Sequence, residues 1–325
     1  MSTRAASPTI ATGLSLRNNS LNFLRVFGAL LVIVSHSPHV TGLGEHPNIG
    51  TMELGVIPVT YFFVISGFLI TGSRYKLNGP RFTARRLARI FPGWWLAVVI
   101  TGLGLSAIAG HERGGWNLHR ALLYIVRNLL FLPGQGGLGS TLHGSGDPST
   151  WNGSVWTIPV ELMCYFTIGC FLAVPYFRHR LKTWSIVACV LTIAVGEYIA
   201  QSNPEPGFLY LLAFFAAGVF LYAWQDRIPL NGRFALGALA ITAVCFQVHQ
   251  IVFLATIPYA YLILWFGANA PQWMKNVGTK NDFSYGIYLY AWPVQQVLVA
   301  YHLQDHGLWV FNIVAMVCSF ALAMV

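Results

Sequence analysis

Charged residues are scarce in this sequence. Asp, Glu, Lys and Arg together make up 9% of its 325 residues, whereas hydrophobic residues make up 55%. A soluble globular domain carries about 25% charged residues, so this chain has too few polar side chains to cover a surface that faces water. The scarcity of charge excludes an ordinary soluble domain and predicts an all-α, polytopic transmembrane helical bundle.

Cysteine is also rare, and its positions form no known binding pattern. No pair has the spacing of a zinc or haem site, and the disulfide framework of a secreted domain would look different. We therefore expect no metal and interpret the cysteines as small apolar packing residues. They are Cys164, Cys170, Cys189, Cys245 and Cys318.

Long apolar segments fill most of the chain. A helix needs roughly 17–25 apolar residues to cross a bilayer, and a search for such segments gives about ten spans within residues 21–325. Residues 1–20 precede the first span, and we expect them to form a cytoplasmic tail. The spans are expected at residues 21–43, 54–73, 90–110, 154–175, 184–201, 208–224, 234–249, 250–267, 283–301 and 307–325.

The distribution of lysine and arginine predicts the orientation of these spans. If the N-terminus is cytoplasmic, most of the 19 basic residues fall in cytoplasmic segments, as the positive-inside rule requires. This arrangement is N-in and C-in, and it needs an even number of spans. Because the basic residues gather at span ends rather than on one soluble face, the net charge of +9 does not indicate nucleic-acid binding.

One predicted outer loop is long and covers about residues 111–153. Residues 116–132 are amphipathic enough to lie along the membrane surface, and residues 134–150 are rich in Gly and Ser, which predicts irregular structure.

Two ionisable residues, Arg25 and His36, share the first span. Eleven positions make about three helical turns, so both side chains face the same side, about 16 Å apart along the axis. Charge inside a span is costly and usually functional. Arg25 could instead extend its charge to the inner interface, and His36 could be an interfacial imidazole bonded to a carbonyl. The pattern leaves both alternatives open.

Glu161 lies in the fourth span, about 12 Å from its outer end and at a depth comparable to that of His36. An imidazole and a carboxylate at one depth could form a base and the group that orients it. The alternative is a structural carboxylate paired with an arginine. Glu197, near the outer end of its span, is better explained as an interfacial residue.

Four arginines precede the third span, at positions 81, 85, 86 and 89. Arg86 and Arg89 are three positions apart and Arg85 and Arg89 four, so each pair shares a helix face. The simple interpretation is a cytoplasmic anchor that sets topology. The sharper one is a phosphate clamp, because guanidinium groups match phosphate oxygens.

Taken together, these segments resemble the acyltransferase-3 family of integral membrane O-acyltransferases, from about residue 21 to the end. Five segments carry the resemblance in order. They are residues 21–36 with Arg25 and His36, residues 61–70, residues 85–92 with Arg86 and Arg89, residues 156–161 with Glu161, and residues 284–293. Many relatives have a histidine where this chain has Ala291.

The resemblance implies a function and a location. Residues 21–325 would form a transmembrane acyltransferase domain in the bacterial cytoplasmic membrane. It would transfer an acyl group from cytoplasmic acetyl-CoA or another acyl-CoA to a hydroxyl of a cell-envelope or exported saccharide. Acetyl is the acyl group that we expect. Many members carry an additional extracellular hydrolase-like domain. We expect none here, so that transfer would finish within the membrane domain.

The resemblance also implies roles for the residues above. His36 would be the base that deprotonates the acceptor hydroxyl, and Glu161 would hold its tautomer. Arg25 would guide the donor or its thioester. Arg86 and Arg89, with Arg85, would bind the phosphates of CoA.

Two other classes of protein remain compatible with the spans. A transporter or flippase also places ionisable groups in its helices, but should show repeats or paired broken helices, and we find neither in the sequence. A catalytically silent membrane scaffold is the third possibility. Consumption of acetyl-CoA would identify the enzyme.

Overall fold

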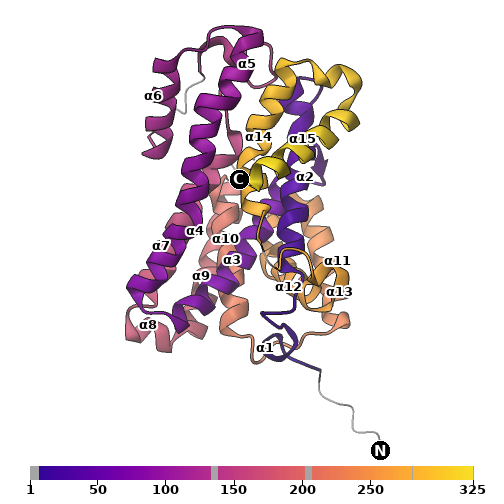
Figure 1. Cartoon of the computed structure of the whole chain (residues 1–325). Coiled ribbons are helices and arrows are strands. Elements are labelled where there is room, and N and C mark those ends of the chain that lie inside the picture. Colours follow the sequence, from indigo (N-terminus) through magenta and orange to yellow (C-terminus); the bar gives the residue numbers. More distant parts are fainter. Residues whose placement is uncertain (1–6, 133–137, 202–206, 280, 325) are drawn as a thin grey trace, which may run out of the picture.

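The structure, a computed structural model, describes residues 7–132, 138–201, 207–279 and 281–324. These residues form a helical bundle with a single two-stranded hairpin (Figure 1). The all-α class predicted from the sequence is confirmed. The longer helices are α2 Leu21–Thr41, α3 Val56–Lys76, α4 Gly79–Val99, α5 Ser106–Arg113, α6 Leu118–Leu129, α7 Thr157–Phe171, α9 Leu181–Ala200, α10 Phe208–Ala223, α11 Gly232–Gln247, α12 Thr256–Asn269, α14 Ser284–Ala300 and α15 Leu308–Ala323.

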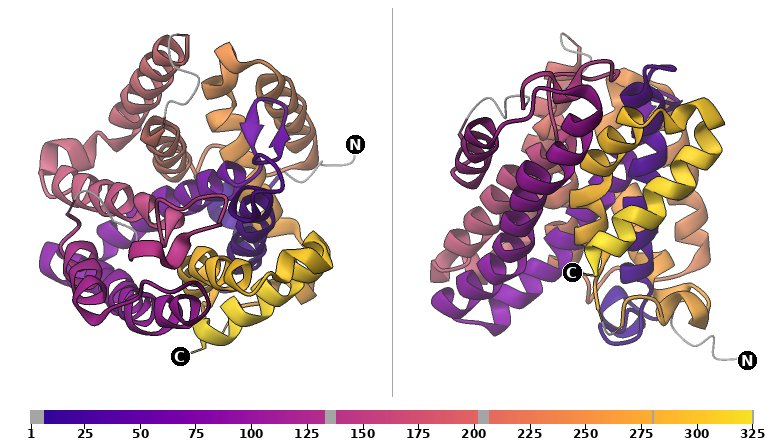
Figure 2. Two further views of the ribbon diagram at one scale, coloured as in Figure 1. Left: turned by 90° about the horizontal axis from the view of Figure 1, so that it is seen from above. Right: turned by 45° about the horizontal axis from the view of Figure 1, so that its top comes forward.

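Short elements mark the two ends of the bundle. We call one end the tail end, because it carries α1 Ile10–Gly13, α8 Pro175–His179 and α13 Gln272–Lys275. The opposite end, the hairpin end, carries α5 and the strands β1 Asn48–Ile49 and β2 Met52–Glu53. Seen end-on, the helices form a ring with α3 near its middle (Figure 2).

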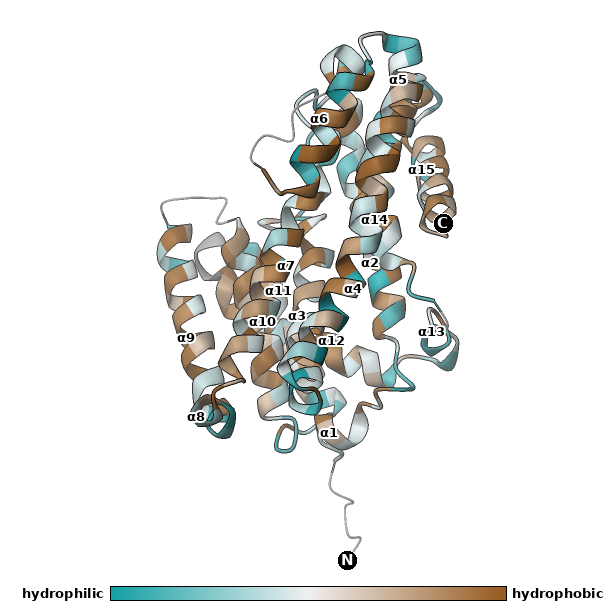
Figure 3. Ribbon diagram, turned by 60° about the vertical axis from the view of Figure 1, so that its left-hand side comes forward, coloured by the Kyte–Doolittle hydropathy of each residue, from teal (hydrophilic) through white to brown (hydrophobic). Residues whose placement is uncertain are grey.

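Many helices are long and apolar enough to identify a multi-pass membrane protein. Among the described residues, 6 reach membrane-spanning length, namely Leu21–Thr41, Val56–Lys76, Gly79–Arg113, Gly153–Phe171, Leu181–Ala200 and Val252–Asn269. Helices α10, α11 and α15 are apolar but shorter. Every predicted span coincides with a helix, while the count of ten and the orientation stay predictions. Hydrophobic residues dominate α9 and α11, whereas hydrophilic ones gather on α8 and α13 (Figure 3).

The third span is much longer than the sequence pattern suggested. Helix α4 continues through a π-helical turn, Ile100–Leu105, into α5, which gives one helix of 35 residues. At 1.5 Å per residue it extends about 52 Å, well beyond a hydrocarbon core of about 30 Å. The predicted span 90–110 covers only its upper part. The lower part, which Asn78 caps through a bond from Arg81 N at 3.1 Å, carries the four arginines.

Glycines allow the central helices to approach closely. A Cβ on Gly67 of α3 would lie 2.2 Å from the carbonyl oxygen of Phe215 on α10, and one on Gly218 would lie 2.2 Å from that of Val64. Helices in membranes often pack through such small residues, because backbones can then touch. This contact fixes α3, whose other side faces the cavities described below.

A buried polar network joins α2, α14 and α15 beside His36. Gln295 Nε2 donates to Ser37 Oγ at 2.7 Å and to the carbonyl oxygen of Ile33 at 2.8 Å. Ser37 in turn donates to Asn312 Oδ1 at 2.5 Å. Because buried polar groups are costly unless paired, this network sets the rotation of α2 at the turn that carries His36.

Residues 118–129 of the predicted amphipathic segment 116–132 form helix α6, while its placement along the membrane surface stays a prediction. Its face toward the bundle buries Ala121 and Tyr124, whereas Leu118, Leu122 and Val126 are exposed. Residues 134–150, expected to be irregular, contain a 3₁₀ turn at Gly139–Leu142 and otherwise irregular backbone where the structure describes them. Residues 133–137 lie outside the described part.

Candidate active site

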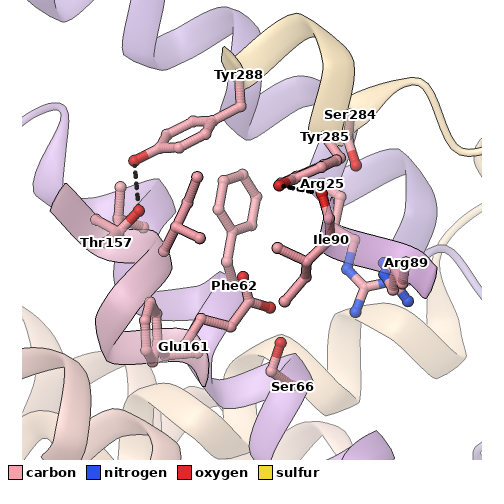
Figure 4. Close-up of a pocket in the computed structure, with 13 residues that line it drawn as sticks. Arg25, Phe62, Ser66, Arg89, Ile90, Thr157, Glu161, Ser284, Tyr285 and Tyr288 are labelled. Atoms are coloured by element: carbon pink, nitrogen blue, oxygen red, sulfur yellow. Dashed lines mark hydrogen bonds between the residues drawn. The ribbon is translucent and has the colours of Figure 1, made fainter. Parts of the chain in front are cut away.

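A small cavity lies between five helices near the middle of the bundle (Figure 4). We call it the arginine cavity. Its volume is about 70 Å³, and its walls combine aromatic rings with charged groups. Its principal lining residues are Arg25 of α2, Phe62 and Ser66 of α3, Arg89 of α4, Glu161 of α7, and Tyr285 and Tyr288 of α14. The structure thus brings three predicted site residues together, namely Arg25, Arg89 and Glu161.

Asp282 links the two arginines of this cavity. Its Oδ2 accepts a hydrogen bond from Arg89 Nη2 at 3.0 Å and lies 3.8 Å from Arg25 Nη1. Its Oδ1 accepts from the backbone N–H and the hydroxyl of Ser284, at 3.2 and 2.5 Å. Burial raises the pKa of Asp282, but the charge of Arg25, the bonds from Ser284 and the charge of Arg89 together lower it below its ordinary value. The carboxylate is therefore ionised and holds both guanidinium groups.

Asp282 was missed in the sequence. The available signal was an acidic residue directly before the tyrosine-rich segment, in a predicted cytoplasmic connection that also carries Lys275 and Lys280. Its importance comes from Arg25 of α2 and Arg89 of α4, whose side chains meet at its carboxylate, and no local pattern reveals this.

Glu161 lies in the arginine cavity rather than beside His36. Its Oε1 accepts a hydrogen bond from Tyr165 OH, one turn further along α7. In the described structure Glu161 lines the cavity that contains Arg25 and Arg89, and His36 lines a different one. The role expected for Glu161, orientation of the imidazole, stays a prediction.

A second and larger cavity opens toward the hairpin end. We call it the histidine cavity. Its volume is about 650 Å³, and its lining includes His36, His46, Glu53 and Trp292. The His36 ring packs edge-on against Trp292, with centroids 4.8 Å apart, and against His46 at 5.1 Å. Its Nδ1 is buried and has no hydrogen-bond partner among the described residues.

His46 and Glu53 were not singled out in the sequence, because they lie in the short connection between the first two spans. His46 Nδ1 lies 3.2 Å from the carbonyl oxygen of Ser35 and 3.4 Å from Glu53 Oε1. The histidines at positions 36, 39 and 46 were the available signal, since three imidazoles around one span end are uncommon in so apolar a chain.

The two cavities adjoin, because Val59 and Tyr288 line both of them. Tyr288 OH donates to the carbonyl oxygen of Ser154 at 2.7 Å and lies 3.0 Å from Thr157 Oγ1. These bonds hold the tyrosine ring across the boundary. One valine and one tyrosine therefore form part of the boundary between the arginines and the imidazole.

The remaining arginines of the predicted clamp lie outside the cavity walls that the structure describes. Arg85 is exposed, whereas Arg86 is partly buried. Arg86 Nε is buried without a hydrogen-bond partner among the described residues. Arg86 lies one helical turn from Arg89 on α4. Its unsatisfied Nε–H is therefore a hydrogen-bond donor close to the arginine cavity.

Glu197 and Ala291 lie away from this chemistry. Glu197 Oε1 accepts a hydrogen bond from the backbone N–H of Leu254 at 3.1 Å, which ties the end of α9 to the segment before α12. Ala291 is fully buried in α14. Neither is among the described residues that line the two cavities.

Comparisons with known proteins agree on one family. A family model described as an acyltransferase domain matches residues 18–325. An O-acetyl transferase of Shigella phage Sf6 is 27% identical, and the match covers 87% of this chain and 86% of that protein. Nodulation protein 10 of Rhizobium leguminosarum bv. viciae is 26% identical over 94% of this chain and 90% of its own length. The exopolysaccharide production protein ExoZ of Rhizobium meliloti (strain 1021) is 28% identical over 76% and 77%. No solved structure matches.

Proposed function

Since the chain belongs to the acyltransferase-3 family of membrane O-acyltransferases, we propose that it transfers an acyl group from cytoplasmic acyl-CoA to a hydroxyl of a cell-envelope or exported saccharide. Acetyl is the expected group, supported by the name of the phage relative. A saccharide acceptor is supported by the name of the exopolysaccharide production protein. The proposed location is the bacterial cytoplasmic membrane.

The observation that carries this proposal is the pair of adjoining cavities. One is lined by Arg25 and Arg89, the other by His36, and both are lined by Val59 and Tyr288. Arg86 and Arg89, with Arg85 beside them, would bind the phosphates of CoA at the tail end. The acyl-bearing arm would extend past Tyr288, and the acceptor would reach His36 from the hairpin end.

Acyl transfer in this arrangement needs one base. A neutral imidazole at His36 would take the proton of the acceptor hydroxyl. The hydroxyl oxygen would then bond to the thioester carbonyl carbon, and the carbon–sulfur bond would break. The departing CoA sulfur would receive the proton from His36, so that the imidazole returns to its neutral form.

The charged groups of the arginine cavity would act on the donor. Arg25 would guide the thioester arm between α2 and α14, because its guanidinium is held at Asp282 and faces the cavity. Glu161 would balance the charge of the two arginines there. Glu161 was also expected to hold the tautomer of His36. Because the two residues line different cavities, Glu161 would do this only indirectly, through the side chains of Val59 and Tyr288 that line both cavities.

Reconstitution tests the base directly. The full chain in liposomes receives radiolabelled acetyl-CoA on the tail side and an acceptor glycan. We expect His36→Ala to reduce transfer at least about 100-fold, as removal of a general base does. His143→Ala is the control, because His143 is exposed and outside the described cavity walls. Full activity in the His36 variant would remove this residue from the mechanism.

Calorimetry tests the donor site separately. The double variant Arg86→Gln and Arg89→Gln should bind CoA more weakly than wild type, with a smaller dependence on salt, since phosphate contacts are screened. The double variant Arg227→Gln and Arg233→Gln, which removes two exposed positive charges outside the described walls of both cavities, serves as the control of equal charge. If the double variant binds CoA with unchanged affinity, Arg86 and Arg89 do not bind the donor and serve only to set the topology.

A further inference from the structure

Three potential metal ligands converge in the histidine cavity. One ligand atom from each of His36, His46 and Glu53 lies within 4.8 Å of the other two. They come from three different places, the outer part of α2, the connection that follows it, and strand β2. We propose that these residues form a binding site for one dication of the zinc class, with its open position facing the histidine cavity.

The ligand types fit this class of ion. Two imidazoles and one carboxylate form a known three-ligand zinc set that keeps a fourth position open. Zinc bonds of about 2.0–2.2 Å place tetrahedral ligand atoms about 3.3–3.5 Å apart, so the three groups must close by little more than 1 Å. Because His46 lies in non-helical backbone and β2 is only 2 residues long, that movement needs no shift of a spanning helix.

The hydrogen bonds of His46 present its other nitrogen to a ligand. Nδ1 lies 3.2 Å from the carbonyl oxygen of Ser35, which can only accept, and 3.4 Å from Glu53 Oε1, so Nδ1 carries the proton and the Glu53 carboxylate would turn from it toward the ion on binding. The lone pair of the neutral ring is then on Nε2. A metal-binding histidine is commonly oriented in this way by a carbonyl or carboxylate at its second nitrogen. His46 is thus held in the tautomer that a metal requires.

Two independent observations indicate that the cavity favours a cation. Nδ1 of His36 is buried and has no hydrogen-bond partner among the described residues, so one polar atom of this ring remains unsatisfied. The lining contains the carboxylates of Glu45 and Glu53 and, within the described part, neither lysine nor arginine. The surrounding charge therefore attracts a dication to the imidazoles.

Metal binding and acyl transfer would exclude each other, a consequence that rests on the proposed function. A neutral imidazole has one lone pair. If His36 donates it to a metal, the same nitrogen cannot accept a proton from an acceptor hydroxyl. A bound ion would also fasten the hairpin to α2 at the cavity mouth. The site would make the enzyme sensitive to zinc-class metals on the hairpin side.

Cobalt titration of the full chain in detergent tests the site without any substrate. We expect wild type to bind one equivalent of Co²⁺ with the visible absorption of a tetrahedral site, and Zn²⁺ to displace it. His46→Gln and Glu53→Gln should each weaken binding at least tenfold, while His143→Gln should bind as wild type. Gel filtration and thermal unfolding establish that each variant is folded. If one fails to fold, the other carries the test.

The outcomes separate this inference from the proposed function. Absence of one-equivalent binding in wild type, or binding that both variants retain, overturns the metal site whatever the enzyme does. If binding is found, micromolar Zn²⁺ should inhibit transfer by wild type and inhibit Glu53→Gln at least tenfold less. Binding by a protein that transfers no acyl group would refute the proposed function and leave the metal site standing.

Discussion

Arg89 on α4 donates a hydrogen bond at 3.0 Å to Asp282, which lies two positions before α14. The same carboxylate oxygen is 3.8 Å from Arg25 of α2. Two guanidinium groups in a partly buried place would repel each other without this counter-charge. The position of both arginines at the cavity therefore depends on one residue outside the spans.

The first prediction concerns the contribution of this residue to stability. Asp282→Asn leaves the buried Arg25 and the 40% exposed Arg89 without their counter-charge, and a buried charged group such as Arg25 that loses its partner costs about 1–3 kcal/mol or more. We expect a lower unfolding temperature in detergent and weaker CoA binding. Asp226→Asn is the matched control, because Asp226 pairs with Lys182 on the surface and is 58% exposed. An exposed pair contributes about 0–1 kcal/mol, and equal losses in the two variants would contradict the prediction.

The stabilisation from Asp282 should depend on pH. Burial raises its pKa, but Arg25, Ser284 and Arg89 lower it further, so that the folded pKa lies below the ordinary value. Such a group stabilises the fold above its unfolded pKa of about 3.9, and the stabilisation is lost as the pH falls through the folded pKa. The difference in unfolding temperature between wild type and Asp282→Asn should be full near pH 7 and shrink below about pH 4. Thermal unfolding across this range measures it, and a constant difference down to pH 3 would count against the assignment.

The helices were predictable from the sequence because hydrophobic length is a local property. Each predicted span coincides with a helix, and the amphipathic segment became α6. The extension of the third span down to Gly79 was not predicted, because its lower part carries the arginines and lowers the local hydropathy. Asn78 supplies the helix cap there, which a hydropathy window does not detect.

The site was predictable as a set of residues but not as an arrangement. Arg25 and Glu161 were selected because charge within a span is rare, and the structure places both in the arginine cavity. The equal depth of Glu161 and His36 suggested that these two residues adjoin. Depth in the membrane, however, does not determine the direction in which a side chain points around its helix axis. His46 was missed because its position depends on the path of a connection, which composition does not determine.

The contact of α3 with α10 gives a prediction about packing. A Cβ on Gly67 or Gly218 would lie 2.2 Å from a backbone oxygen of the facing helix, and backbone cannot move aside as a side chain can. We expect Gly67→Val and Gly218→Val to destabilise the fold by about 1–3 kcal/mol or more, as overpacking does. Gly237→Val on α11 is the control, since nothing lies within 4 Å of a Cβ there. Comparable unfolding temperatures for all three variants would show that the helices do not touch as described.

The boundary between the cavities gives the sharpest prediction about the path of the donor. Val59 is buried and lines both the arginine and the histidine cavity. A tryptophan there would fill the boundary beside Tyr288 and narrow the arginine cavity, whereas Arg86 lines neither cavity in the described structure and keeps its surroundings. We expect Val59→Trp to retain CoA binding in calorimetry and to lose transfer in liposomes at least tenfold.

Val190→Trp separates a blocked path from a general effect of a large side chain in a span. Val190 is 60% exposed on α9, where a tryptophan would face the surroundings of the bundle and meet no cavity wall. Transfer by this variant should equal that of wild type. If Val59→Trp folds, binds CoA and still transfers at the wild-type rate, the acyl group does not pass between Val59 and Tyr288. The two cavities would then serve separate purposes, and His36 would have to receive its donor by another route.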